Sequence, residues 1–170
     1  MTDINPSLKI AVLTVSDTRT EETDKSGKTL VDRLTKAGHQ LAEKAILKDD
    51  KYLLRAKVAN WVADEVPVVL ITGGTGITGR DVTPDAISPL FDKEIPGFGE
   101  LFRMLSYDEI KTSTIQSRAI AGLSNSTLIF CLPGSTGACM TAWDKILKDQ
   151  LDVGHGPCNF VEIMPRIKEV

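Results

Sequence analysis

The sequence has no excess of positive charge and no long apolar run. Its 20 lysines and arginines are outnumbered by 23 aspartates and glutamates, which gives a formal net charge of −3. Such a balance offers no basic face for nucleic acid or for an anionic membrane. No stretch reaches the roughly 18 apolar residues of a membrane-spanning helix, and the polar start does not resemble a signal peptide. We therefore expect a cytoplasmic protein that binds neither nucleic acid nor a membrane.

Cysteine and histidine are also scarce. The three cysteines, Cys131, Cys139 and Cys158, are odd in number and lack the spacing of metal ligands. Cys131 lies in an apolar run and Cys139 on an apolar helical face, so both are expected to be buried free thiols. The two isolated histidines, His39 and His155, are too few for a zinc site.

The composition is that of a globular protein, with 42% hydrophobic and 25% charged residues in a chain of 170. This length favours one domain, which we place at residues 9–160, between an N-terminal extension (1–8) and a C-terminal tail (161–170). Apolar runs predict strands at residues 9–15, 40–47, 68–71 and 127–132, and helical periodicity predicts helices near residues 30–37, 51–62, 84–91, 98–110 and 136–151. This alternation predicts an α/β fold, a three-layer αβα sandwich with a mostly parallel central sheet.

The most informative segment is the glycine-rich bend that follows the apolar run at residues 68–71. Gly73, Gly74 and Gly76 lack the Cβ atoms that would keep a ligand's phosphates away from main-chain N–H groups. Asp81 follows, where it could hold a divalent cation. Thr83 is predicted to be the N-cap of the next helix, whose positive end would face the same place. The segment predicts an anionic, nucleotide-like ligand together with a metal ion.

Ligands of such sheets bind beyond the carboxyl ends of the strands. We expect four loops to converge on one crevice there, at residues 14–17, 48–50, 73–81 and 133–137. Asp49 and Asp81 are the acids that could hold Mg²⁺, which binds through one or two carboxylates plus substrate phosphates. Asp49 could equally be only the N-cap of the following helix.

Each of the other polar residues of these loops could have either a ligand-binding role or a purely structural one. Ser16, Asp17 and Ser135 could contact a ligand or only satisfy a turn. Arg80 and Arg118 are candidate phosphate partners, although exposed arginines are usually solvated. The residues alone do not decide between these readings.

Two familiar motifs are matched only in form. Residues 74–79 fit GxGxxG, but no helix opens directly after them and no strand ends in a suitable acid about 20 positions on. Residues 27–29 imitate the end of a P-loop, but Glu22 occupies the place of its leading glycine and would repel phosphates, so Lys28 is expected to be a solvated helix residue. Trp61 and Trp143 lie at helical spacing among aliphatic residues, which predicts core packing.

Six short motifs stand out along the chain: TVSD at 14–17, TGGTG at 72–76, RDVTPDA at 80–86, PGFGE at 96–100, SRA at 117–119 and LPGS at 132–135. In sequence and order they resemble the motifs of the MoaB/Mog family of molybdenum cofactor biosynthesis proteins. The likeness runs from about residue 10 to residue 160, and the length and flanking segments are most similar to the MoaB branch.

The resemblance implies a molybdopterin adenylyltransferase, which uses ATP and Mg²⁺ to transfer AMP to the terminal phosphate of molybdopterin. Asp49 and Asp81 match the family's catalytic aspartates by position. The remaining carried-over positions are a set of substrate- or nucleotide-binding residues: Ser16, Asp17, Gly73, Gly74, Thr75, Gly76, Arg80, Pro133, Gly134 and Ser135, of which the last three form the pterin-side turn.

Adenylyl transfer is not credited uniformly to MoaB-type members. The alternative is therefore a molybdopterin-binding carrier or scaffold without turnover, and a phosphohydrolase has less support because no base is placed to activate water. The resemblance also implies a homo-oligomer, a trimer or hexamer, and a molybdate-insertion protein as a partner. From the residues, Phe98, Leu101, Phe102 and Leu105 offer weak support for self-association.

Overall fold

A computed structural model describes residues 6–170 of the chain and shows one six-stranded sheet in the order β2-β1-β3-β6-β5-β4. β2, β1, β3 and β6 run parallel, whereas β5 is antiparallel to β6 and β4 is antiparallel to β5. The strands are β1 (Lys9–Val15), β2 (Gln40–Leu47), β3 (Val68–Thr72), β4 (Lys93–Glu94), β5 (Ile120–Ser124) and β6 (Thr127–Leu132). The mostly parallel sheet predicted from the sequence is confirmed.

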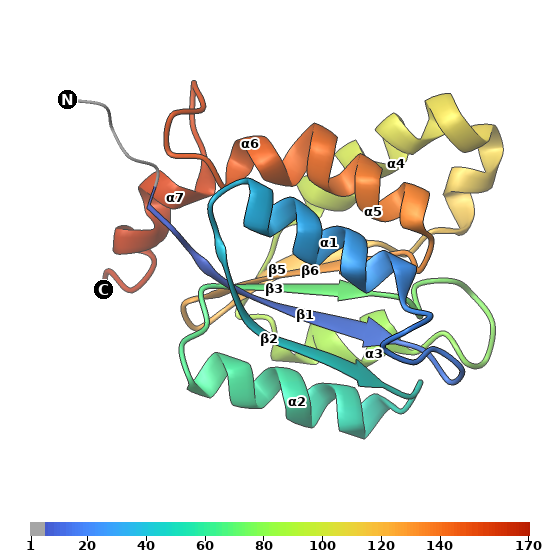
Figure 1. Ribbon diagram of the computed structural model, residues 1–170. Helices are drawn as coiled ribbons and strands as arrows, with labels where there is room; N and C mark the ends of the chain where they lie inside the picture. Colours follow the sequence, from blue (N-terminus) through green and yellow to red (C-terminus); the bar gives the residue numbers. More distant parts are fainter. Residues whose placement is uncertain (1–5) are drawn as a thin grey trace.

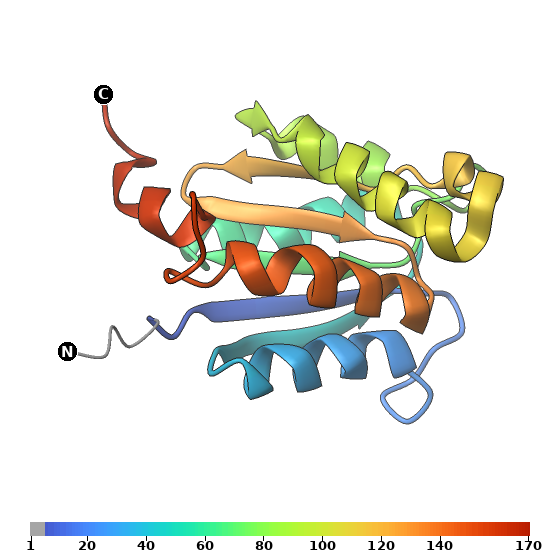
Figure 2. The same cartoon turned by 90° about the horizontal axis from the view of Figure 1, so that it is seen from above.

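Helices cover both faces of the sheet, which gives the expected three layers (Figure 1). α1, α4 and α5 pack on one face, and α2 and α3 on the other; the view from above shows α1, α5 and α4 side by side (Figure 2). The α-helices are α1 (Lys25–Lys36), α2 (Lys51–Ala63), α3 (Thr83–Ile87), α4 (Pro96–Ile110), α5 (Thr136–Ala142), α6 (Lys148–Gln150) and α7 (Phe160–Ile163). Shorter turns are the 3-10 segments η1 (Ser88–Leu90), η2 (Lys111–Gln116) and η4 (Met164–Arg166), and the π-helical η3 (Trp143–Leu147).

Two apolar cores form because successive residues of a strand point to opposite faces of the sheet. In β1, Ile10 and Val12 pack under α1 and α5, whereas Ala11 and Leu13 pack over α2 and α3. All five residues of β3 are buried, as expected for a parallel strand covered on both faces. The edge strand β2 is exposed or only half-buried along its length.

The sequence prediction missed two strands and misplaced some helix ends. The stretch at residues 112–122, for which the sequence predicts no strand or helix, contains most of η2 and the start of β5. The helix predicted at 98–110 begins at Pro96, and the one predicted at 84–91 is a short α3 followed by η1. β5 escaped notice because its burial does not alternate and a glycine interrupts it.

The remaining fold predictions concern single side chains. Cys131 and Cys139 are buried free thiols, and Trp61 and Trp143 are packed in the two cores, all as predicted. Met140, which follows Cys139 on the same helix, is 41% exposed. Burial raises the pKa of Cys139 to about 11, so this thiol is inert at neutral pH.

The chain ends and the surface complete the description. Part of the predicted extension, residues 1–5, lies outside the described residues, and the tail from residue 161 contributes to α7 and η4. Within residues 6–170, no helix is long and apolar enough to cross a membrane. Lys28 is an exposed residue of α1, in agreement with the rejection of a P-loop.

Candidate functional site

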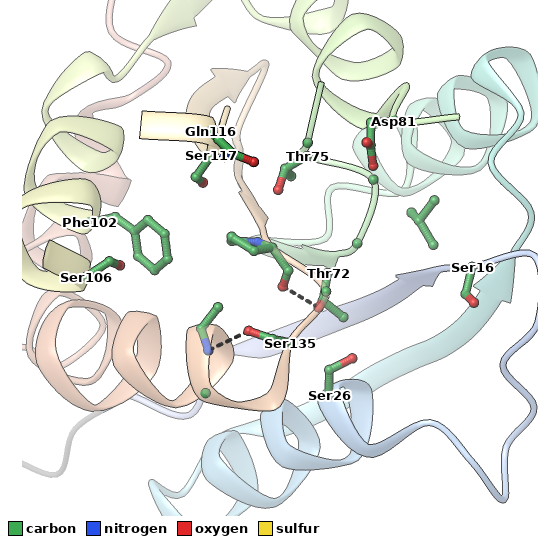
Figure 3. A pocket seen from close by; sticks show the side chains of 18 of the residues that line it. Ser16, Ser26, Thr72, Thr75, Asp81, Phe102, Ser106, Gln116, Ser117 and Ser135 are labelled. Atoms are coloured by element: carbon green, nitrogen blue, oxygen red, sulfur yellow. Dashed lines mark hydrogen bonds between the residues drawn. The ribbon is translucent and has the colours of Figure 1, made fainter. Parts of the chain in front are cut away.

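A cavity of about 510 Å³ opens at the carboxyl ends of β1, β3 and β6. Three of the four predicted loops line it, namely those that follow these strands. Figure 3 shows Asp81 and Thr75 on one side of the cavity and Phe102 and Ser106 across from them. Of the predicted site residues, those that line the cavity are Ser16, Gly73, Gly74, Thr75, Gly76, Asp81, Pro133, Gly134 and Ser135.

The bend after β3 needs glycine at its first two positions. Gly73 and Gly74 have φ angles of +107° and +69°, which L side chains rarely adopt. A Cβ on Gly73 would also clash with the carbonyl oxygen of Val15. The Thr83 side chain does not cap α3 as predicted, because Val82 is the N-cap residue; instead its hydroxyl donates to the carbonyl of Gly73 at 2.7 Å. Thr83 therefore fixes the bend itself.

The Asp81 carboxylate is held over this bend. Its Oδ2 accepts hydrogen bonds from the Thr78 N–H at 2.9 Å and from the Thr78 hydroxyl at 2.6 Å. The hydrogen bonds from Thr78 lower the pKa of Asp81, and the main-chain N–H of Gly76 adds to this effect. Asp81 is therefore a charged group at neutral pH that lines the cavity.

Asp49 lies beside the same bend, just outside the lining residues. Its Oδ1 is 3.1 Å from the position that a Cβ on Gly74 would occupy. The N-cap of α2 is Asp50, whose Oδ1 accepts from the N–H groups of Tyr52 and Leu53 at 2.9 Å each. Asp49 is thus free of the capping role that the sequence left open.

Asp49 lies among charges of both signs, because Arg80 favours its ionised form and two carboxylates oppose it. Burial raises the pKa of Asp49, and repulsion from Asp17 and Asp81 adds to the shift. Within residues 6–170, no group of three or more His, Cys, Asp or Glu side chains has the arrangement of a complete metal site. Any ion held by Asp49 and Asp81 would need further ligands from substrate and water.

Asp17 and Arg80 form an ion pair at the edge of the cavity. Arg80 Nε donates to Asp17 Oδ2 at 2.9 Å and Nη2 donates to Oδ1 at 2.7 Å. Asp17 Oδ1 also accepts from the main-chain N–H of Asp49 at 3.2 Å. The hydrogen bond from Arg80 holds the pKa of Asp17 below its ordinary value. The pair connects the loops after β1, β2 and β3, although neither residue lines the cavity.

The hydroxyl oxygens of the two serines predicted for the site accept hydrogen bonds from main-chain N–H groups. Ser135 Oγ accepts from the N–H of Ala138 at 3.1 Å and caps α5. Ser16 Oγ accepts from the N–H groups of Thr18 and Arg19 at 3.2 and 3.1 Å. In each case the oxygen is an acceptor in a local turn, which leaves the O–H able to donate to a ligand in the cavity.

One wall of the cavity was not predicted. It is formed by α4 and η2, and Phe102, Ser106 and Ile110 follow one another along it at a spacing of four residues. That spacing, with a serine between two apolar residues, was the available signal. Ser26 of α1 also lines the cavity and was not predicted, whereas Thr14 of β1 belongs to the predicted loop at residues 14–17. Arg118, a candidate phosphate partner, donates to main-chain carbonyls of the glycine-rich loop instead.

Known proteins are similar to this chain over most of its length. A family model described as "Probable molybdopterin binding domain" matches residues 11–153. Over 153 residues the chain is 58% identical to molybdenum cofactor biosynthesis protein B of Escherichia coli (strain K12). The match covers 89% of this chain and 90% of that protein.

Solved structures give the same result. A crystal structure of a molybdenum cofactor biosynthesis protein B superposes with a TM-score of 0.87 at 43% identity, covering 96% of this chain and 98% of that chain. The tungsten cofactor synthesizing protein MoaB from Pyrococcus furiosus superposes with a TM-score of 0.79 at 34% identity, with coverages of 96% and 98%.

Proposed function

The chain belongs to the MoaB/Mog family of molybdenum cofactor biosynthesis proteins, and from that premise we propose that it is a molybdopterin adenylyltransferase. The substrates would be molybdopterin and ATP, and the products adenylyl-molybdopterin and pyrophosphate. A role in molybdenum cofactor biosynthesis is supported by the relatives, which are named molybdenum cofactor biosynthesis protein B. The match covers 90% of the length of each of these two relatives. Adenylyl transfer itself is the finer proposal, and use of ATP agrees with the cytoplasmic location expected from the sequence.

The observation that carries the proposal is the position of two carboxylates beside glycines of one bend. Asp49 lies beside the Gly74 position and Asp81 beside the Gly76 position. Main-chain N–H groups of such a bend can bind phosphate oxygens, and carboxylates at its edge can hold the cation that accompanies a polyphosphate. This combination of donors supports a nucleotide triphosphate as co-substrate.

Mg²⁺ fits this donor set. Mg²⁺ is commonly held by one or two protein carboxylates and completed by substrate phosphates and water. A cation would also relieve the repulsion that raises the pKa of Asp49. The chemistry that Mg²⁺ supplies when bound is neutralisation of charge on the triphosphate and on the departing pyrophosphate.

The remaining residues would position the two substrates. An oxygen of the pterin's terminal phosphate attacks the α-phosphorus of ATP, the bond from this phosphorus to the β-phosphate's bridging oxygen breaks, and pyrophosphate leaves with the electron pair. Such a transfer depends on alignment and charge neutralisation more than on covalent help from the protein. In the loop at residues 73–76, the N–H groups of Gly74 and Thr75 would bind nucleotide phosphates, because the Gly73 N–H donates to the Leu132 carbonyl at 2.9 Å and the Gly76 N–H faces Asp81. Arg80, which is paired with Asp17, would add positive charge from outside the cavity lining. Pro133, Gly134 and Ser135 would hold the pterin side.

The test is incubation of the protein with molybdopterin and ATP–Mg²⁺, followed by detection of adenylylated pterin and pyrophosphate. We expect product from the wild type and from Asp32→Asn, an exposed α1 control, and a loss of at least about 100-fold in Asp81→Asn. A wild type that binds molybdopterin but forms neither product would indicate the carrier or scaffold role instead. Nucleotide hydrolysis without pterin would indicate a phosphohydrolase.

Self-association is part of the proposal. A stripe of exposed apolar side chains runs along α4 and η2, with Met104 63%, Tyr107 49% and Ile115 79% exposed. Phe98 and Phe102, by contrast, belong to the core of a single chain. We propose that the stripe contacts a second copy in the trimer or hexamer expected from the resemblance. A molybdate-insertion protein would receive the product.

A further inference from the structure

Arg118 lies between η2 and β5 and connects this part of the chain to the glycine-rich loop. Its main-chain N–H donates to the Thr75 carbonyl at 2.9 Å. Its guanidinium donates from Nε to the Gly76 carbonyl and from Nη2 to the Asp81 carbonyl, each at 2.8 Å. The carboxylate of Asp85 lies 3.2 Å from the same guanidinium. One side chain therefore grips the main chain at both ends of the loop between Gly76 and Asp81.

The other contacts of this loop do not perform the same task. The bonds between Thr78 and Asp81 are internal to the loop. Arg80 does reach another loop through Asp17, but its side chain is 67% exposed, and an exposed ion pair holds a loop weakly. The Arg118 side chain is 35% exposed and its acceptors are main-chain oxygens. Such charge-assisted hydrogen bonds are the stronger restraint on the loop's shape.

We infer that Arg118 is a positioning residue for the metal–nucleotide site. By fixing the carbonyls of Gly76 and Asp81, it sets the distance and direction of the Asp81 carboxylate relative to the glycine bend. Asp85 orients the guanidinium from the opposite side. The inference rests on the proposed function, because it assigns Arg118 to the support of the carboxylate that would hold Mg²⁺.

The task requires a guanidinium. Its N–H groups point in fixed directions in one plane, so Nε and Nη2 can reach two carbonyls while Nη1 and Nη2 face a carboxylate. The ammonium of a lysine is a point donor on a flexible stem and cannot span the same acceptors with the same geometry. A lysine at this position would therefore keep the positive charge but lose the simultaneous hydrogen bonds to the Gly76 and Asp81 carbonyls.

The experiment measures Mn²⁺ binding in the presence of α,β-methylene-ATP by electron paramagnetic resonance. Removing a group that supports a metal ligand weakens metal binding by about 10- to 100-fold. We expect such a loss in Arg118→Gln and in Arg118→Lys, and partial recovery in Arg118→Ala when guanidinium is added at a non-denaturing concentration. Asp85→Asn should show a smaller loss of the same kind.

Arg55 provides a matched control. It also donates to two main-chain carbonyls, those of Ala86 at 2.9 Å and Asp85 at 3.1 Å, but it does not contact the loop. Arg55→Gln should lower the unfolding temperature about as much as Arg118→Gln and leave Mn²⁺ affinity unchanged. This comparison separates positioning of the site from general stability.

The outcomes distinguish the two levels of the proposal. Unchanged Mn²⁺ affinity in Arg118→Lys, or an equal loss in Arg55→Gln, overturns the role of Arg118 and leaves adenylyl transfer standing. A wild type that holds Mn²⁺ with the nucleotide but forms no adenylyl product contradicts the proposed reaction alone. A wild type that holds no Mn²⁺ with the nucleotide overturns both.

Discussion

The carboxylate of Asp81 occupies the space next to Gly76, and a Cβ on that glycine would lie 2.6 Å from Asp81 Oδ2. The absence of a side chain at residue 76 thus does more than expose main-chain N–H groups. It allows a carboxylate to lie directly on the loop, so that the proposed phosphate donors and the proposed cation ligand would share one location. This contact makes the geometry of the site sensitive to a single methyl group.

Gly76→Ala should therefore weaken the proposed adenylyl transfer by at least about tenfold while the fold persists, because the new methyl group displaces the Asp81 carboxylate. Gly76 does not have a positive φ angle, so the main chain accepts alanine. Gly79→Ala is the control in the same loop, since a Cβ there meets nothing within 4 Å. Steady-state rates and circular dichroism of both variants check the prediction, and equal rates would contradict it.

Asp49→Asn should stabilise the protein in the absence of divalent cations. Burial and repulsion from Asp17 raise the folded-state pKa of Asp49, so the wild type loses stability as the pH rises through the interval from the unfolded to the folded pKa. Above that interval the variant should gain less than about 1 kcal/mol in the free energy of unfolding. Urea unfolding at neutral pH and at about pH 4 should show that the variant's gain in the free energy of unfolding is smaller in acid. A gain that grows in acid would be inconsistent with the raised pKa.

Asp24→Ala should destabilise the fold by about 3 kcal/mol. The Asp24 side chain is fully buried, and it accepts from the Thr14 hydroxyl at 2.7 Å and the Gly27 N–H at 3.0 Å while facing Lys44 at 3.0 Å. Its removal leaves these groups without their common acceptor. Chemical denaturation checks the value, with Asp32→Ala on the exposed side of α1 as the control.

The same carboxyl also predicts a pH effect. Burial alone would raise the pKa of Asp24, but the hydrogen bonds from Thr14, Gly27 and Lys44 lower it. The contribution of Asp24 is therefore present above the ordinary carboxyl pKa and is lost as the pH falls through the lowered folded value. The stability difference between wild type and Asp24→Ala should accordingly diminish in acid.

Met104→Glu should dissociate the proposed oligomer. A charge placed in the exposed apolar stripe of α4 and η2 would be buried against a second copy, which costs about 2 kcal/mol and weakens association roughly 30-fold. Leu53→Glu on α2, where the native side chain is 50% exposed, is the control on the other face of the sheet. Sedimentation velocity distinguishes the two, and a monomeric wild type would contradict the proposed assembly.

The sequence was sufficient for the parts of the fold that have one dominant local signal. Four consecutive apolar residues at 68–71 predicted the buried strand β3, which ends one residue later at Thr72. The glycines that follow predicted the bend, and two apolar helical faces predicted α1 and α2. Asp81 lies in the same loop as these glycines, whereas Asp49 reaches the bend from the loop after β2 because the carboxyl ends of parallel strands share an edge.

The remainder depended on contacts between segments far apart in the chain. The Thr83 hydroxyl donates to the Gly73 carbonyl rather than accepting from an N–H of the first turn of its own helix, and no local pattern distinguishes these two roles. The short β4 is defined only by its pairing with β5, and the wall formed by α4 becomes part of the site only when α5 packs beside it.

The reversed direction of β5 explains how residues from opposite halves of the chain reach the same loop. Ile120, the first residue of β5, pairs with Cys131 near the end of β6. The chain therefore enters β5 at the edge where the four parallel strands finish, and a parallel β5 would have delivered Ser117 and Arg118 to the far side of the sheet. Because β5 is antiparallel, the segment that precedes it lies at the edge of the sheet where the other loops of the site follow the ends of parallel strands.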